Sequence, residues 1–241
     1  MTTSTNRRVL ITGASSGIGK ETALTFAKAG YDLILVARSM EKLQAIADEA
    51  QSYGVQATAH TLDLAQVEQV KSQVQALMAH NGFIDILVNS AGMGYTQPLA
   101  ETPLNDWQRV IDLNLTSVFQ CIQAVLPSMR DRGQGVIINV ASVAAHSAFP
   151  DWGAYSVSKA GLVSLSRILS AEERGNGIRV ITITPGAVNT PIWDTDTVQA
   201  DFDRSSMLTP DIVANSIVHA ATLPQHAVIE ELTLMPSGGA L

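Results

Sequence analysis

Short runs of β-branched and other apolar residues alternate with longer stretches of helical pattern through most of the chain. Runs such as Leu33–Ala37 are apolar at every position, which is typical of strands that are covered on both faces. Parallel strands need long crossover connections, and the helical stretches between the runs provide them. The alternation therefore predicts a doubly wound α/β fold of the Rossmann type, a seven-stranded parallel sheet with helices on both faces.

The pattern locates each expected element. Strands are expected at Val9–Thr12, Leu33–Ala37, Ala57–Leu62, Ile84–Asn89, Val136–Val140, Arg179–Thr184 and Leu232–Met235. Helices are expected at Gly17–Ala29, Glu41–Tyr53, Gln66–His80, Asp106–Arg132, Ala154–Arg174 and Pro210–Thr222. In a fold of this kind, ligands bind at the carboxyl ends of the strands.

The chain has no internal repeat and no linker rich in Pro, Gly or Ser, so we expect residues 1–241 to form one domain. Only Ala187–Leu208 lacks a clear helical or strand pattern. An irregular segment of this length in a compact domain is usually functional, and it is often a lid.

Composition excludes several classes of function. The formal net charge is −7 and Lys and Arg do not cluster, which argues against a nucleic-acid partner. No apolar run approaches the ~20 residues that span a bilayer, so we expect no membrane partner. The polar start of the chain lacks the apolar core of a signal peptide, and the single Cys121 suits a reducing compartment; both favour a cytoplasmic location.

A glycine-rich turn follows the first strand and opens the first helix, with the sequence Thr12-Gly13-Ala14-Ser15-Ser16-Gly17-Ile18-Gly19. Glycines at such a turn let backbone N–H groups approach a pyrophosphate, and the helix N-terminus adds partial positive charge. The spacing differs from the common G-x-G-x-x-G. Its position between strand and helix favours a dinucleotide-phosphate site that includes Gly13, Ser15, Ser16, Gly17, Ile18 and Gly19.

The end of the second strand indicates the type of cofactor. An acidic side chain here usually binds the ribose 2′-hydroxyl of NAD, whereas Arg pairs with a 2′-phosphate. This chain has Ala37 followed by Arg38 and Ser39, which favours NADP(H).

Tyr155 and Lys159 stand four positions apart and so share one face of a helix. An ammonium beside a phenol favours the phenolate, so Lys159 is expected to lower the pKa of Tyr155 from ~10. Tyr155 is then a candidate general acid or base.

These features together resemble the single-domain branch of the short-chain dehydrogenase/reductase family, in particular its NADP-dependent carbonyl reductases. Thr12–Gly19 matches the family's phosphate turn, Asp63-Leu64 its adenine contact, and Asn89-Ser90-Ala91-Gly92 its motif after the fourth strand. Further matches are Asn114 in the long helix, the set Ser142, Tyr155 and Lys159, and the loop Pro185-Gly186 with Val188 and Thr190. One departure is Ser16, where NADP-dependent relatives often carry a basic residue.

The resemblance implies a single dinucleotide-binding and catalytic domain that interconverts a ketone or aldehyde and an alcohol by hydride transfer. It implies that Ser142 bonds the carbonyl oxygen, that Tyr155 transfers the proton, and that Lys159 tunes Tyr155 and binds the nicotinamide ribose. Asn114 is implied to hold an ordered water on a proton path to Lys159. A cofactor contact is implied for Asp63, Leu64, Asn89, Ala91, Gly92, Tyr155, Lys159, Pro185, Gly186, Val188 and Thr190.

Apolar and aromatic residues flank this catalytic set. The candidates for the substrate pocket are Met93, Tyr95, Ala144, His146, Phe149, Trp152 and Trp193. Their mix lacks a basic anchor and favours a neutral small-molecule carbonyl substrate. The five histidines do not recur with Cys, Asp or Glu at ligand spacing, so we expect no metal.

Other readings stay open. The same family contains 3-oxoacyl-[acyl carrier protein] reductases, for which Arg130 and Arg132 are the candidate docking residues. The tail Glu231–Pro236 is similar to relatives that act on hydroxy acids or hydroxy amino acids. A different class is a non-catalytic NADP-binding regulator. The family also implies a homotetramer, or a dimer, through the two long helices and the C-terminal strand.

Overall fold

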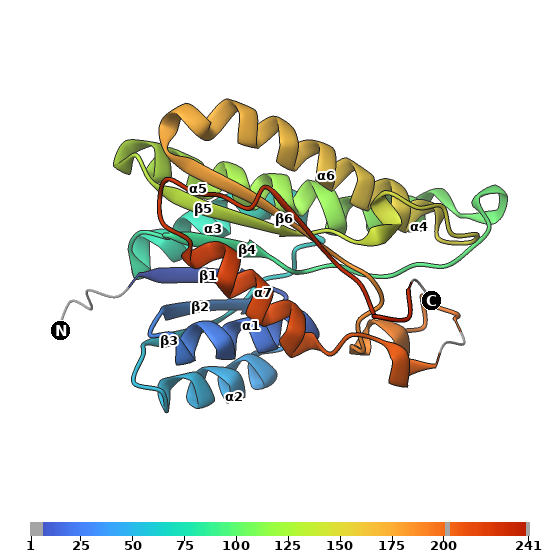
Figure 1. The fold of residues 1–241 in the computed structure, drawn as a ribbon, viewed down its shortest axis with the longest axis horizontal. Coiled ribbons are helices and arrows are strands. Elements are labelled where there is room, and N and C mark those ends of the chain that lie inside the picture. Colours follow the sequence, from blue (N-terminus) through green and yellow to red (C-terminus); the bar gives the residue numbers. More distant parts are fainter. Residues whose placement is uncertain (1–6, 201–202, 240–241) are drawn as a thin grey trace.

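The computed structural model describes residues 7–200 and 203–239, and in these a single sheet forms the centre of the protein (Figure 1). The strands pair only in parallel, in the order β3-β2-β1-β4-β5-β6-β7. Their bounds are β1 Arg8–Thr12, β2 Asp32–Ala37, β3 Ala57–Thr61, β4 Ile86–Asn89, β5 Gly135–Val140, β6 Ile178–Pro185 and β7 Glu231–Leu234. The predicted seven-stranded doubly wound fold is confirmed.

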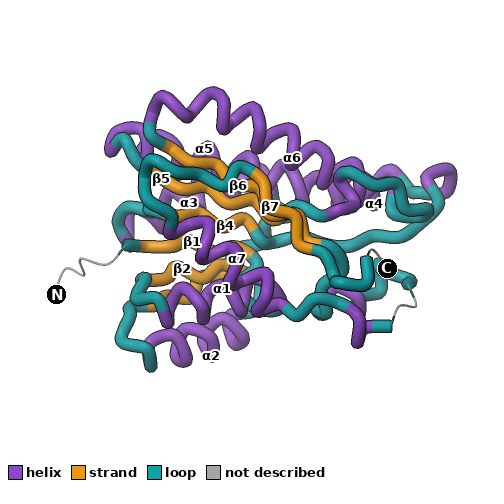
Figure 2. The backbone as a smooth tube through the Cα atoms, in the orientation of Figure 1, coloured by secondary structure: helices purple, strands orange, loops and turns teal. Residues whose placement is uncertain are grey.

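Helices cover both faces of this sheet (Figure 2). They are α1 Gly17–Lys28, α2 Met40–Gln51, α3 Val67–Asn81, α4 Leu104–Ile111, α5 Ser117–Arg132, α6 Gly153–Glu173 and α7 Pro210–Thr222. One core contains α1, α2 and α7 with strand residues such as Val9 and Ile11, and the other contains α3, α5 and α6 with Leu10. Successive strand residues point to opposite faces, so burial on both faces explains the continuous apolar runs.

The expected helix Asp106–Arg132 differs from the structure in two respects. The helical stretch begins at Leu104 and is interrupted by one π-helical turn, Asp112–Thr116, in which the Ser117 N–H bonds the Asp112 carbonyl. Such a turn accommodates an extra residue and often marks a functional site. Asn114 lies within it and is fully buried.

By length and composition alone, Leu104–Arg132 is also the one helix among the described residues that is long enough and apolar enough to cross a membrane. We did not anticipate such a candidate from the sequence. Its α5 part packs against α3, β4 and β5, and residues such as Val125 and Met129 lie in the core. Packing within the protein accounts for these buried apolar side chains, whereas Leu104 and Phe119 of the same helix stay exposed.

The sheet has its switch point between β1 and β4. From β1 the chain runs outward through β2 and β3 and then returns to the other side of β1, where Thr12 is in register with Asn89. The connections that leave these two strands diverge, and a crevice opens at the carboxyl edge. The phosphate turn and the Asn89–Gly92 segment meet there.

The segment from Ala187 to Leu208 closes over the same edge. Its ends are joined by a bridge between Val188 and Leu208, and its described residues, 187–200 and 203–208, include the short 3-10 turns Pro191–Asp194 and Arg204–Ser206. The Thr197 hydroxyl donates to the Gly94 carbonyl at 2.8 Å, and the Thr96 N–H donates to the Thr197 carbonyl at 2.9 Å. Its role as a lid stays a prediction.

Candidate active site

The phosphate turn depends on glycine at two points. Gly13 has φ +68°, and a Cβ there would lie 2.7 Å from the Ala91 Cα. A Cβ at Gly19 would collide with the Gly13 carbonyl oxygen. Helix α1 starts after Ser16, whose side chain makes no capping hydrogen bond, and its first turn holds no acidic residue. The turn and the helix end are therefore suited to an anion.

Thr12 joins this turn to the end of β4. Its hydroxyl accepts hydrogen bonds from the Ser90 and Ala91 N–H groups, both at 3.2 Å, and donates to the Val88 carbonyl at 3.4 Å. These bonds hold the Asn89–Gly92 segment beside Gly13.

The end of β2 supplies an exposed guanidinium. Arg38 makes no hydrogen bond or ion pair among the described residues, so its donors are available. The Ser39 hydroxyl accepts from the Lys42 N–H at 3.4 Å and caps α2. Asp63 is exposed and accepts from the Ala65 N–H at 3.1 Å, and Leu64 is buried. An unpaired guanidinium here fits a 2′-phosphate.

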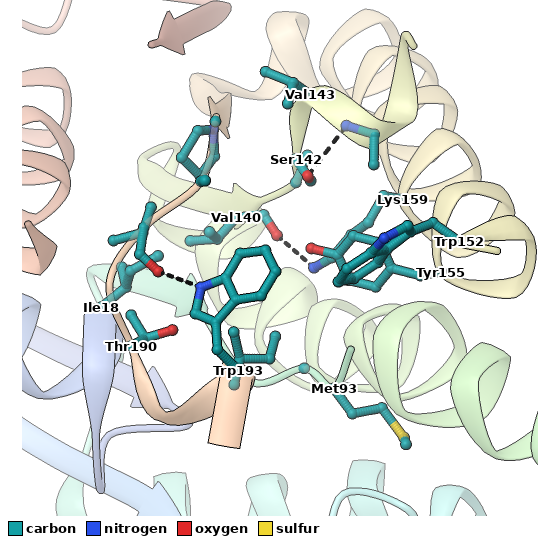
Figure 3. Close-up of a pocket in the computed structure, with 18 of the residues that line it drawn as sticks. Ile18, Met93, Val140, Ser142, Val143, Trp152, Tyr155, Lys159, Thr190 and Trp193 are labelled. Carbon is teal, nitrogen blue, oxygen red and sulfur yellow. Dashed lines mark hydrogen bonds between the residues drawn. The ribbon is translucent and has the colours of Figure 1, made fainter. Parts of the chain in front are cut away.

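A cavity lies beyond the carboxyl ends of β4, β5 and β6 and contains the catalytic set (Figure 3). Ser142 follows β5, and Tyr155 and Lys159 come from α6, one turn apart. The Ser142 oxygen accepts from the Ala144 N–H at 3.2 Å and its hydroxyl hydrogen bonds Tyr155. The three side chains predicted from the sequence are thus brought together at one wall.

Burial dominates the electrostatics of this wall. It lowers the pKa of Lys159 from 10.5 to about 8, and the ammonium donates to the Val140 carbonyl at 2.9 Å. It raises the pKa of Tyr155 above its ordinary 10.0, and the hydrogen bond with Ser142 opposes this rise. The expectation of a lowered pKa for Tyr155 is therefore wrong, because desolvation of the phenolate is the largest cause and raises the pKa; the Lys159 ammonium lies 5.8 Å from the ring centroid.

Asn114 uses its amide to position neighbouring groups. Its Oδ1 accepts from the Met93 N–H at 2.9 Å, and its Nδ2 donates to the Met93 carbonyl and to the Ser158 Oγ, both at 3.0 Å. The Ser158 hydroxyl donates in turn to the Tyr155 carbonyl at 2.6 Å. Both amide N–H groups are occupied by protein atoms, so the bound water implied for Asn114 stays a prediction.

A series of buried side-chain hydrogen bonds behind the site was not predicted from the sequence. Asn89 Nδ2 donates to Asn139 Oδ1, and Asn139 Nδ2 donates to Ser166 Oγ, both at 2.8 Å. This series ties β4 and β5 to α6 next to the catalytic wall. Its one visible signal was Asn139, a polar residue inside an otherwise apolar strand.

The structure separates the candidate pocket residues into two groups. Met93, Ala144, Phe149, Trp152 and Trp193 line the cavity, as do Ile18, Pro185, Gly186, Val188 and Thr190 on the side of the phosphate turn. The residues Ala141, Val143, Ala187 and Ile192 also line it but were not singled out from the sequence. Loop side chains of this kind give no periodic signal.

Tyr95 and His146 lie outside the cavity, contrary to expectation. Tyr95 packs with Val110 and Ala154, and its hydroxyl donates to Asp106 at 3.0 Å. His146 is drawn toward β7, where its Nε2 is 2.9 Å from Glu231. A carboxylate partner outside the pocket holds each side chain away from it.

Within residues 7–200 and 203–239, no group of three or more His, Cys, Asp or Glu side chains could hold a metal ion. The expected absence of a metal stays a prediction. The available donors, namely the turn N–H groups, Arg38 and Lys159, suit a phosphorylated dinucleotide.

Comparison with known proteins identifies the family of the chain. The family model described as short chain dehydrogenase matches residues 7–200. An uncharacterized oxidoreductase of Listeria monocytogenes is 33% identical over 240 residues, which are 96% of this chain and 97% of that protein. The chain is also 31% identical to a glycine betaine reductase of Emericella nidulans but spans only 18% of its length.

Solved structures show the same fold. An alcohol dehydrogenase from the archaeon Thermococcus sibiricus, complexed with 5-hydroxy-NADP, has a TM-score of 0.87 and 30% identity, with 96% of this chain and 97% of that chain covered. A serine dehydrogenase complexed with NADP+ has a TM-score of 0.86 and 30% identity, with 97% and 96% covered.

The fold and the family match define an oxidoreductase with a Rossmann-type fold. The chain belongs to the short-chain dehydrogenase/reductase family.

Proposed function

We propose that the protein is an NADP(H)-dependent oxidoreductase that interconverts a ketone or aldehyde and an alcohol, secondary alcohols included. The observation that carries this proposal is the convergence of Ser142, Tyr155 and Lys159 on one wall of a cavity beside the phosphate turn. NADP(H), when bound, supplies or accepts the hydride. The chain itself has to bind the carbonyl oxygen and move one proton.

Two hydroxyl groups can donate hydrogen bonds to the carbonyl oxygen of the substrate. Ser142 donates a hydrogen bond where negative charge develops, and Tyr155 gives up its proton in reduction or accepts one in oxidation. Because burial raises the pKa of Tyr155, the phenol carries its proton at neutral pH, which is the form needed for reduction. Lys159, with a pKa of about 8, keeps donors for the ribose hydroxyls besides its bond to Val140.

The cofactor preference rests on Arg38. Its guanidinium is exposed at the end of β2 and has no partner among the described residues, and Ala37 occupies the position where an acid would favour NAD. Gly13, Gly17 and Gly19 with the start of α1 would hold the pyrophosphate. Neighbours complexed with NADP+ or 5-hydroxy-NADP, such as the serine dehydrogenase and the Thermococcus sibiricus enzyme, support this preference.

The test is NADPH consumption with a panel of ketones and aldehydes by the native protein, Tyr155→Phe and Tyr95→Phe. We expect Tyr155→Phe to lose about 10²–10⁴-fold in kcat/KM, the usual contribution of general acid catalysis. Tyr95→Phe is the matched control, because that hydroxyl bonds Asp106 outside the cavity. Full activity in Tyr155→Phe would show that Tyr155 is not the proton donor.

Both docking candidates for an acyl carrier protein, Arg130 and Arg132, already have acidic partners. Arg130 forms an ion pair with Glu173, and Arg132 pairs with Asp85 at 2.8 Å. The reading as a hydroxy-amino-acid dehydrogenase gains support from the similarity to serine dehydrogenase. The presence of Ser142, Tyr155 and Lys159 together at the cavity argues against a non-catalytic regulatory protein.

We also propose that the protein assembles as a homotetramer or dimer. Exposed apolar side chains on α5 and α6, namely Phe119, Val157 and Ile168, support contact through these helices. Light scattering of the native protein and of Ile168→Glu tests this, and a native monomer would contradict it.

A further inference from the structure

We propose that the cavity selects an uncharged ketone or aldehyde with an aromatic or branched apolar substituent, and that Trp152 and Trp193 form the wall for this substituent. The inference rests on the proposed function and names the substrate class of the same site. It separates this protein from hydroxy-acid and hydroxy-amino-acid dehydrogenases.

An aromatic surface leads away from the proton donor. The Trp152 ring meets Tyr155 edge to face, with centroids 5.3 Å apart, and meets Trp193 in the same way at 5.6 Å. All three rings line the cavity (Figure 3). A carbonyl oxygen bonded to Tyr155 places the rest of the substrate beside this surface, and the neighbouring walls are the side chains of Met93, Val143, Phe149 and Ile192.

Both tryptophans are held in place before any substrate arrives. Trp193 Nε1 donates to the Val188 carbonyl at 2.8 Å, which fixes the indole on the Pro191–Asp194 turn. Trp152 lies against Gly94, where a Cβ would come within 3.5 Å of its ring. A surface positioned in advance binds a rigid apolar group without paying for its own ordering.

Basic side chains beside the lining residues Thr190 and Ala144 already contact acidic partners. Arg204 pairs with Asp194 and donates to Asn189 Oδ1 at 2.9 Å and to the Thr190 carbonyl at 3.0 Å. His146 and Arg167 both contact Glu231, each at 2.9 Å. Lys159 is the one cationic side chain among the described lining residues, and the proposed function assigns it to the cofactor ribose.

A charged substrate is therefore disfavoured for either sign. A carboxylate would lose water without gaining a cation, which costs several kcal/mol. A quaternary ammonium group would meet aromatic rings, but no Asp or Glu of the described residues lines the cavity and Lys159 repels it. An uncharged group loses little water and gains the contact with the rings.

The experiment compares ketones that differ mainly in charge. Neopentyl methyl ketone is matched with trimethylammonioacetone, and methyl levulinate with levulinate; benzylacetone and acetone test the aromatic substituent. We expect each neutral ketone to exceed its charged partner by about 100-fold in kcat/KM, the factor that follows from an unpaired buried charge. Benzylacetone is expected to be the best substrate of the set.

Variants of Trp193 test whether its ring contacts the apolar substituent of the substrate. Trp193→Ala is expected to lower kcat/KM for benzylacetone by about 10-fold or more and to affect acetone less, because acetone has no group that reaches the ring. Trp193→Phe keeps an apolar ring and is expected to retain most of the activity. Trp107→Phe is the control, since Trp107 packs with Tyr95 outside the cavity.

NADPH binding by calorimetry is measured for each variant as a readout independent of turnover. If NADPH binds and no ketone of the panel is reduced, the proposed function and this inference both fall. If ketones are reduced but levulinate or trimethylammonioacetone equals its neutral partner, only this inference is wrong. If Trp193→Ala lowers kcat/KM equally for acetone and benzylacetone, Trp193 does not contact the apolar substituent and this inference is likewise wrong.

Discussion

Asn114 holds the backbone of Met93 at both of its polar groups, accepting from the N–H at 2.9 Å and donating to the carbonyl at 3.0 Å. The same amide donates to Ser158, one residue before Lys159. The π-helical turn of Asp112–Thr116 contains the residue that makes these bonds. The pocket wall at Met93 and the helix that carries Tyr155 and Lys159 are thereby joined through one side chain.

Asn114→Ala is expected to lower the free energy of unfolding by about 2–3 kcal/mol, because the partly buried N–H and carbonyl of Met93 lose this partner and the Ser158 hydroxyl loses one of its two hydrogen bonds. Urea unfolding measures the change. Asn105→Ala, at an exposed position of α4, is the control and should change stability little. Equal stability of native protein and Asn114→Ala would contradict this role.

Arg38→Asp is expected to lower the ratio of kcat/KM for NADPH over NADH by about 10–100-fold, the value of a charged hydrogen bond to the 2′-phosphate. The ratio is measured with one ketone substrate and both cofactors. Arg109→Asp introduces the same charge change at an exposed site on α4. If both variants shift the ratio alike, overall charge and not a contact is responsible.

Lys159→Met is expected to be more stable than the native protein at neutral pH. Below pH 8 the folded protein holds a buried ammonium. The difference between the ordinary pKa of 10.5 and the pKa of about 8 in the folded protein corresponds to a destabilisation of about 3 kcal/mol. This cost fades as pH rises from 8 to 10.5, because the unfolded chain then binds the extra proton. The advantage of the variant should shrink over this window in urea unfolding.

The exposed variant Lys42→Met provides the control for that pH series. Its difference from the native protein should stay flat between pH 7 and pH 10.5. A flat difference for Lys159→Met as well would mean that the buried ammonium is not penalised.

Gly13→Ala and Gly30→Ala form a matched pair. Both glycines have positive φ, +68° and +83°, but only at Gly13 does a Cβ meet another residue, 2.7 Å from Ala91. Gly30→Ala should cost about 1–2 kcal/mol from the backbone conformation alone. Gly13→Ala should cost more and also weaken NADPH binding, as calorimetry would detect; similar losses for the pair would contradict the contact.

Much of the fold followed from local pattern. Runs such as Leu33–Ala37 are apolar throughout because each strand is buried on both faces, so the alternation with helices identified a parallel sheet. The exception was Asp112–Thr116, since a π-helical turn leaves the helical periodicity of the sequence almost unchanged.

Only some features of the candidate site could be predicted from the sequence. Spacing alone placed Tyr155 and Lys159 on one helical face, and the turn Thr12–Gly19 could be located because a strand and a helix flank it. Spacing does not reveal desolvation, so the direction of the pKa shift of Tyr155 was wrong. Tyr95 and His146 were misplaced for a related reason, because their partners Asp106 and Glu231 become neighbours only in the folded chain.

The sequence by itself therefore determined the doubly wound fold and the phosphate turn, which depend on short-range spacing and on the order of elements along the chain. The set Ser142, Tyr155 and Lys159 was implied by the resemblance of its motifs to a known family. Only the tertiary structure decided which side chains line the cavity, which cations are already paired and how burial shifts the pKa values. Those properties arise from contacts between residues far apart in sequence and from exclusion of water, and neither is encoded in any local stretch.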